Sequence, residues 1–250
     1  MAHFRMKKIK RIISIVAVLF VSVCCFENQA LETQEKPNEE GTKKVYLTFD
    51  DGPIPKITEE ILDILEKEEV RATFFVVGKE IHGREKILKR INEEGHTIGL
   101  HTYSHKFKDI YRSEEAFIQE MEKTSELIDE VLGKSLNAKI IRFPGGSAGR
   151  LNEHFFKALK EKGYSIYDWN VSLEDGVNPN LSPYQIFQNA KKSIDAGGTK
   201  IILAHCNSNN KNTCKALPNI IQYYKEQGYQ FKAIDEKTPD YYYGYQKTKE

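Results

Sequence analysis

Two hydrophobic patterns alternate along the chain between about Lys44 and Ile234. Short runs of β-branched and aromatic residues predict buried strands, and apolar residues that recur three and four positions apart predict helices with one buried face. The predicted strands are 45–49, 73–77, 97–100, 139–142, 165–171, 200–204 and 230–234. The predicted helices between them are 57–65, 85–94, 113–132, 152–162, 183–196 and 217–227.

This alternation predicts the fold class. Strands that alternate with helices form a parallel sheet, and seven such units fit a closed or nearly closed barrel better than a small open sheet. We therefore expect an α/β fold, a distorted (β/α)7 barrel of the TIM-like type, in a single catalytic domain at residues 44–235.

The first residues follow a different pattern. Basic residues between Arg5 and Arg11 precede an uncharged apolar run, Ile12–Phe26. Because a membrane-spanning helix needs about 20 apolar residues and this run is shorter, residues 1–26 resemble a secretory signal, with an N-terminal membrane anchor as the alternative. We expect an exported protein at the extracellular face of the membrane or in the cell wall, whose N-terminal segment contacts the membrane during export or as an anchor. No clean cleavage site follows, so its removal stays open.

Two further segments carry little that could be buried. Residues 27–43 are rich in Glu, Gln, Asn, Pro and Lys, which predicts a flexible spacer. Residues 236–250 form a Tyr-rich tail that we expect to pack on the surface or to fray, with an aromatic contact to a glycan as an alternative.

Charge and cysteines restrict the partners. The chain has 37 Lys and Arg against 36 Asp and Glu; without the five basic residues of the first segment, 32 face 36, a net charge of −4. A mildly acidic chain argues against nucleic acid as a partner. Beyond the export segment only Cys206 and Cys214 remain, and a disulfide and two free thiols are both open.

Candidate chemistry stands at the ends of predicted strands. Asp50 and Asp51 follow the first strand, and parallel α/β folds bind ligands at that end. His101 and His105 follow the third strand, and four-residue spacing on one helical turn would let both imidazoles reach one metal ion. A surface turn and two unrelated surface histidines are the alternatives. Together with one carboxylate, the pair would form the ligand set of a catalytic divalent metal.

Four motifs in order then resemble the NodB-homology polysaccharide deacetylases, carbohydrate esterase family four. The resemblance covers about Lys44 to Ile234. The matching segments are Thr48-Phe49-Asp50-Asp51-Gly52-Pro53, His101-Thr102-Tyr103-Ser104-His105, Arg142-Phe143-Pro144-Gly145-Gly146-Ser147 and Leu203-Ala204-His205.

The resemblance implies a metal site and a base. One divalent metal ion, zinc first and cobalt or manganese as alternatives, would be held by Asp51, His101 and His105. Asp50 would be the general base, and Arg142 would hold the carboxylate of that base.

The resemblance also implies a donor, an acid and a pocket. The backbone N–H of Gly145 would stabilise the oxyanion, His205 would be the general acid, and Leu203 would contact the acetyl methyl group. Many members carry an aromatic residue at the position of Gly145, so the glycine predicts a more open glycan subsite.

A fifth motif matches less well. Asp175 aligns best with the carboxylate that orients His205, but Gly176 replaces the usual tryptophan and Asp168 competes for the role. Trp169 would form part of the substrate-binding wall or pack in the core.

The expected function is removal of N-acetyl groups from an amino-sugar polymer with release of acetate. A predicted export segment favours a cell-wall glycan, peptidoglycan with its N-acetylglucosamine or N-acetylmuramic acid units. Alternatives are a chitooligosaccharide or acetyl-xylan deacetylase and a catalytically silent cell-wall glycan-binding protein. A two-metal phosphodiesterase would need more carboxylates. The sequence does not indicate an oligomeric state.

Overall fold

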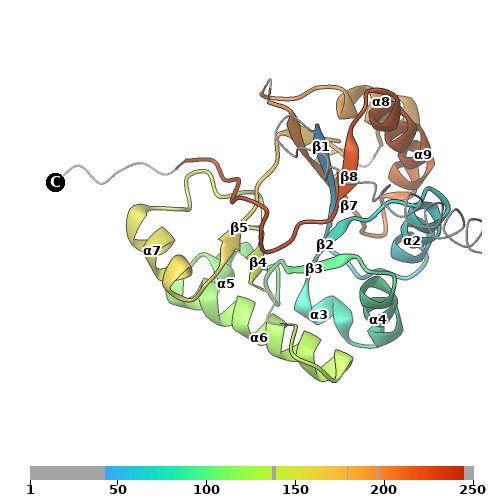
Figure 1. Cartoon of the computed structure of the whole chain (residues 1–250). Coiled ribbons are helices and arrows are strands. Elements are labelled where there is room, and N and C mark those ends of the chain that lie inside the picture. Colours follow the sequence, from blue (N-terminus) through green and yellow to red (C-terminus); the bar gives the residue numbers. More distant parts are fainter. Residues whose placement is uncertain (1–42, 137–138, 179, 196, 245–250) are drawn as a thin grey trace, which may run out of the picture. The chain divides into compact units, whose positions relative to one another are not determined.

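The computed structural model describes residues 43–136, 139–178, 180–195 and 197–244. Eight strands lie in the middle of this fold with the helices around them (Figure 1). The strands are β1 (Lys44–Asp50), β2 (Thr73–Val76), β3 (Thr97–Leu100), β4 (Ile140–Ile141), β5 (Ser165–Ile166), β6 (Val171–Ser172), β7 (Thr199–His205) and β8 (Gln230–Lys232). The helices are α2 (Ile57–Lys67), α3 (Gly78–Ile81), α4 (Glu85–Glu93), α5 (Phe107–Ile110), α6 (Glu114–Leu132), α7 (Glu153–Glu161), α8 (Pro183–Ala190) and α9 (Lys211–Glu226).

All pairings between the strands are parallel, and the order is β5-β4-β3-β2-β1-β7-β6. β8 pairs with the first half of β1, whose second half pairs with β2. Within the described residues no pairing joins β5 to β6, so the curved sheet is a half-barrel. The predicted fold class, a distorted α/β barrel in one domain, is confirmed.

Three element predictions were wrong in detail. The strand predicted at 165–171 is two short strands, because the residues between them leave the sheet and pair with Tyr241 in the C-terminal segment. The helix predicted at 183–196 ends at Ala190. The helix predicted at 217–227 begins earlier, at Lys211, and contains Pro218, which the sequence pattern had placed in a first turn.

Helix ends follow local side-chain chemistry. Ser113 accepts a hydrogen bond from the backbone N–H of Ala116 at the start of α6, and Gly133 ends that helix with φ 64°. Ser182 and Gln185 form a capping box at the start of α8. These contacts fix the helices that surround the sheet.

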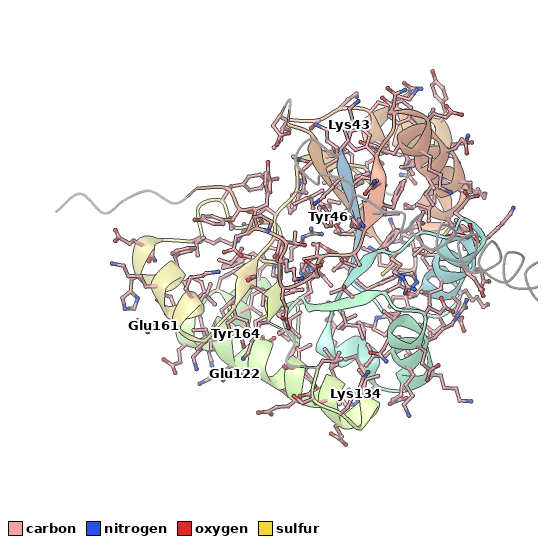
Figure 2. All side chains as sticks on the ribbon, viewed as in Figure 1. Lys43, Tyr46, Glu122, Lys134, Glu161 and Tyr164 are labelled. Carbon is pink, nitrogen blue, oxygen red and sulfur yellow. The ribbon has the colours of Figure 1, made fainter. Side chains whose placement is uncertain are left out.

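Alternation along β1 divides the core into two clusters. Tyr46, labelled in Figure 2, is buried in a small cluster with Phe75, Tyr167, Ile201 and Ile234. Strands β1, β2 and β7 thus all contribute to this smaller buried cluster.

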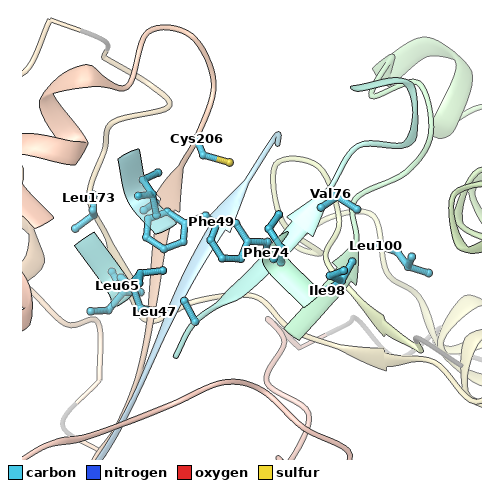
Figure 3. Packing of buried hydrophobic residues seen from close by; sticks show 14 of the residues in the cluster. Leu47, Phe49, Leu65, Phe74, Val76, Ile98, Leu100, Leu173 and Cys206 are labelled. Carbon is cyan, nitrogen blue, oxygen red and sulfur yellow. The ribbon is translucent and has the colours of Figure 1, made fainter. Parts of the chain in front are cut away.

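The opposite face of β1 packs against the helices. Leu47 and Phe49 belong to this larger outer cluster, where the rings of Phe49 and Phe74 stack with centroids 5.2 Å apart (Figure 3). Because residues on this face are buried, the register of β1 is fixed, and Asp50 is aligned with His205 at the end of β7.

The predicted segment 1–26 and all of the predicted spacer 27–43 except Lys43 lie outside the described residues. In the described part of the chain, no helix combines the length and the apolar character that a bilayer crossing requires. Of the predicted tail, residues up to Gly244 are described, and Tyr241 packs against the domain by donating its N–H to the carbonyl of Ile166.

Phe117 of α6 is fully buried and stacks on Phe143 with ring centroids 4.3 Å apart, beneath the segment that begins at Arg142. We expect Phe117→Ala to lower the free energy of unfolding by about 3–5 kcal/mol, because it removes a ring from a closely packed core. Urea denaturation measures this change. Tyr184→Ala, at a side chain that is 70% exposed, is the control and should shift it by less than about 0.5 kcal/mol. Equal effects would contradict the packing role of Phe117.

Candidate active site

Several predicted site residues meet at the carboxyl end of the sheet. Asp50 ends β1 and His205 ends β7, and these two residues are register partners. His101 and Arg142 directly follow β3 and β4, and their backbone N–H groups continue the ladder to the carbonyls of Val76 and Leu100. The sheet therefore brings together groups that are far apart in the sequence.

Asp51 reaches the same site although it is adjacent to Asp50. Neighbouring strand residues normally point to opposite faces, but Asp51 lies past the end of β1 with φ 76°. This left-handed backbone turns its carboxylate toward the two histidines, so one site has two carboxylates in different positions. Asn207 donates from its side-chain amide to Asp51 Oδ2 at 3.3 Å.

The segment from His101 to His105 is a loop, so the predicted helical turn was wrong. Positive φ angles at Thr102 (65°) and His105 (54°) fold the loop so that both imidazoles face Asp51. The Nε2 atom of His101 lies 3.8 Å from Asp51 Oδ1, and that of His105 lies 3.4 Å from the same oxygen.

These three side chains fit a single divalent cation. Their ligand atoms lie within 4.8 Å of one another. Ligands held at about 2.1 Å from a tetrahedral ion are about 3.4 Å apart, close to the observed separations. The Nδ1 atom of His101 is 2.9 Å from the carbonyl of Arg142, so it carries the proton and leaves the Nε2 lone pair toward Asp51.

The charges also suit a cation site. Burial, followed by the charge of His101, lowers the pKa of His105 and favours the neutral imidazole that metals bind. Burial alone would raise the pKa of Asp51, but His101, His205 and His105, when they are protonated, outweigh it and lower that pKa. The Asp51 carboxylate is thus held ionised.

Arg142 is fully buried and fixes Asp50. Its Nη1 atom donates to Asp50 Oδ1 at 2.9 Å and to Thr48 Oγ1 at 2.6 Å. The remaining nitrogens donate to the backbone carbonyls of Tyr167 and Asp168. Asp50 Oδ2 stays on the side of His101, 3.6 Å from its Nε2.

Asp175, and not Asp168, lies against His205. The carboxylate of Asp175 accepts from His205 Nδ1 at 2.8 Å and from the His205 backbone N–H at 3.0 Å. Burial opposes the charged imidazole, but the hydrogen bond and charge of Asp175, with Asp50 and Asp51, raise the pKa of His205 to about 9. The imidazole is therefore protonated at neutral pH.

Sequence reasoning missed two groups that hold Asp175. Thr213 donates from its hydroxyl and Asn210 from its amide to Asp175 Oδ2, at 2.7 and 3.2 Å. Both come from the start of α9, which the sequence pattern had placed later. Sequence reasoning also missed Thr48, whose hydroxyl oxygen accepts a hydrogen bond from Arg142. Thr48 stands inside the first motif, so the motif could have indicated this contact.

Gly176 lies directly against the ring of His205. A Cβ atom at this position would lie 2.3 Å from the ring of His205, so the imidazole occupies the space of a side chain. Gly176 is therefore compatible with an imidazole placed directly against it.

Asp168 has a different contact set. Its buried carboxylate accepts from the backbone N–H of Ser147 at 3.0 Å, from the Ser147 hydroxyl at 2.5 Å and from the backbone N–H of Tyr243 at 2.8 Å. It ties the loop after Arg142 to the C-terminal segment, and it makes no contact with His205 among the described residues.

Gly145, Leu203 and Trp169, the predicted substrate contacts, differ in their surroundings. Gly145 has φ 74°, a backbone that favours glycine, and its N–H has no partner among the described residues. Leu203 is buried on β7, in register with Thr48. Trp169 is half-buried, in edge contact with Tyr243 and close to Gly146.

Both cysteines of the domain are free and buried. Cys206 donates its backbone N–H to the carbonyl of Asp50 at 2.9 Å. Burial raises the pKa of both thiols, that of Cys214 to about 12, so they remain protonated and serve packing.

An Asp and two His side chains, with a separate carboxylate and an imidazole–carboxylate pair beside them, define the site of a metal-dependent hydrolase. The comparisons agree with this class. The family model described as polysaccharide deacetylase matches residues 37–167, and the chain belongs to that family. The family is metal-dependent, and the Asp51, His101 and His105 cluster provides a candidate site.

Relatives and solved structures extend the match. A peptidoglycan-N-acetylglucosamine deacetylase of Bacillus cereus is 35% identical over 205 residues, 80% of this chain and 72% of that protein. The peptidoglycan-N-acetylmuramic acid deacetylase PdaA of Bacillus subtilis is 33% identical over 196 residues, 78% and 71% of the two chains. The catalytic domain of a peptidoglycan N-acetylglucosamine deacetylase from Eubacterium rectale superposes with a TM-score of 0.73 at 32% identity, covering 82% and 94%.

We expect Asp175→Asn to lower kcat by about 10- to 100-fold, because His205 loses the carboxylate that keeps it protonated and oriented. A general acid acts only when protonated, so activity falls as the pH rises through its pKa. Since the substitution lowers that pKa, the basic limb of the pH–rate profile should move to lower pH. Asp168→Asn is the control and should leave the basic limb in place. A shift of that limb in the Asp168 variant alone would contradict this assignment.

Proposed function

We propose that this protein is a metal-dependent deacetylase of peptidoglycan, which hydrolyses the N-acetyl group of N-acetylglucosamine or N-acetylmuramic acid units and releases acetate. The observation that carries the proposal is the placement of Asp50 and His205 beside the Asp51, His101 and His105 cluster. The names of the relatives support the choice of glycan.

The two sides of the cluster suit opposite proton transfers. Asp50 lies on one side with Oδ1 held by Arg142, so Oδ2 is positioned to take a proton from the attacking water. His205 is held protonated by Asp175 and gives a proton to the nitrogen that leaves. A bound divalent cation, zinc in this proposal, would supply Lewis acidity that activates water and polarises the acetamide carbonyl.

The acetyl group is bound by the remaining residues of the site. The N–H of Gly145 donates to the carbonyl oxygen as negative charge develops on it, and Leu203 contacts the methyl group. Residues 1–26 direct export or anchor the chain, 27–43 form a spacer, and the catalytic domain at 44–235 acts outside the membrane, where peptidoglycan lies.

Metal removal tests the cation requirement. Dialysis against a chelator should abolish acetate release from purified peptidoglycan fragments, because His101, His105 and Asp51 would hold the ion that supplies water activation. Added Zn²⁺, Co²⁺ or Mn²⁺ should restore turnover, and the order of restored rates ranks the metals. Unchanged turnover in chelator would rule out the metal role.

Two substitutions separate the base from the ligands. Asp50→Asn should keep metal stoichiometry near that of the wild type while kcat falls by about 10²–10⁴-fold, because the proton acceptor is lost. His101→Ala should lose both metal and turnover. Metal content by mass spectrometry and acetate release give the two readouts. Equal metal loss in both variants would overturn this division of roles.

A further inference from the structure

The space beside Gly145 is occupied by side chains from elsewhere, so the subsite is less open than the sequence suggested. A Cβ atom on Gly145 would lie 3.2 Å from Arg150 Nη2 and 3.4 Å from the ring of Phe107. Phe107 begins α5, just after His105, and Arg150 follows the loop of Gly145. These two residues therefore form the wall at this edge of the site.

Phe107 offers an exposed ring to a ligand. Its side chain is 46% exposed. Its ring lies edge-on to that of His105, with centroids 5.7 Å apart. An exposed aromatic ring next to the candidate metal cluster is suited to pack against the apolar face of a sugar.

Arg150 has half of its guanidinium available. The group lies over the rings of Tyr111 and Phe107, 4.8 and 5.5 Å from their centroids. Nη1 donates to the carbonyls of Gly145 and Gly146 at 3.0 and 2.9 Å. Neither Nε nor Nη2 has a hydrogen-bond partner in the described ranges, and no carboxylate there pairs with Arg150. A guanidinium edge of this kind matches a carboxylate in a bidentate pair.

The neighbouring rim has the same sign of charge. Lys106, Lys108 and Arg112 are exposed, and none of them forms an ion pair with another described residue. Asp109 is the one acidic residue between positions 106 and 112. Because the chain beyond its first segment is mildly acidic, a basic rim here is a local feature that attracts anions.

The geometry points to a carboxylate-binding subsite in which a sugar packs on Phe107 and a carboxylate of the same glycan pairs with the free edge of Arg150. This inference rests on the proposed function and specifies its substrate class: acidic amino-sugar polymers are preferred over uncharged ones. The carboxylate comes from the lactyl group of N-acetylmuramic acid or from a peptide attached to it. Chitooligosaccharides have neither.

The test compares acetate release from three oligosaccharide classes of equal length. These are chitooligosaccharides, peptide-free peptidoglycan strands with free lactyl carboxylates, and peptide-bearing strands in which the lactyl group is an amide. For Arg150→Gln we expect the ratio of kcat/KM on acidic to uncharged glycans to fall about tenfold, the size of one charged hydrogen-bond pair. The ratio cancels any loss caused by the loop carbonyls that Nη1 holds. Arg150→Lys should give an intermediate ratio, because it keeps the charge and loses the fork.

Two control variants, and a comparison of the two possible sources of the carboxylate, complete the design. Lys134→Gln removes one positive charge at the opposite end of α6 from α5 (Figure 2) and should not change the ratio. Phe107→Ala should raise KM for all three classes, whereas Tyr184→Ala, another exposed aromatic, should not. If Arg150→Gln lowers kcat/KM only on peptide-free strands, the bound group is the lactyl carboxylate. If it lowers kcat/KM only on peptide-bearing strands, the bound carboxylate belongs to the peptide.

The inference is overturned if Arg150→Gln reduces kcat/KM equally on acidic and uncharged glycans, or if the wild type shows no preference between them. Calorimetric binding of the same glycans keeps the result separate from the proposed function. If no glycan yields acetate, the proposed function fails. Weaker binding of acidic glycans by Arg150→Gln, with binding that declines as salt rises, would still support the subsite, and equal binding would overturn it.

Discussion

A buried arginine sets the arrangement of the catalytic end. Arg142 lies inside the barrel, where an unpaired guanidinium would cost several kcal/mol. Its charge is met by Asp50, by the hydroxyl of Thr48 and by the carbonyls of Tyr167 and Asp168. The Arg142 side chain thereby joins β1, β4 and the segment after β5. The position of Asp50 is therefore set by the pairing of a buried positive charge as well as by the reaction.

The same interaction separates the roles of two adjacent aspartates. Asp50 stays in the strand and faces Arg142, whereas Asp51 turns out with φ 76° and faces His101 and His105. Across the site, His205 pairs with the anionic Asp175, whereas Asp50 pairs with the cationic Arg142. Opposite partners on opposite sides are what a reaction needs when one proton is taken and another is given.

The sequence predicted the parts that depend on local pattern. Short apolar runs predicted β1 and β7, and residues at or directly after the ends of predicted strands, such as Arg142 and His101, were placed at the correct end. The partner of His205 could not be chosen, because Asp175 is selected by Thr213 and Asn210 from α9, a contact between distant segments. The loop at His101–His105 was mistaken for a helical turn, since positive φ angles at non-glycine residues leave no reliable sequence signal.

The loop that carries Gly145 is held in place by the side chains around it. Two consecutive glycines favour many conformations, yet the loop is held from several directions. Tyr111 donates its hydroxyl to the carbonyl of Pro144, Arg150 holds the next two carbonyls, and Asp168 holds the N–H of Ser147. With these groups bound, the N–H of Gly145 is left without a partner among the described residues, as the proposed role of oxyanion donor requires. A donor fixed before the reaction stabilises developing charge without reorganisation, so the rigidity that glycines cannot provide comes from the side chains around them.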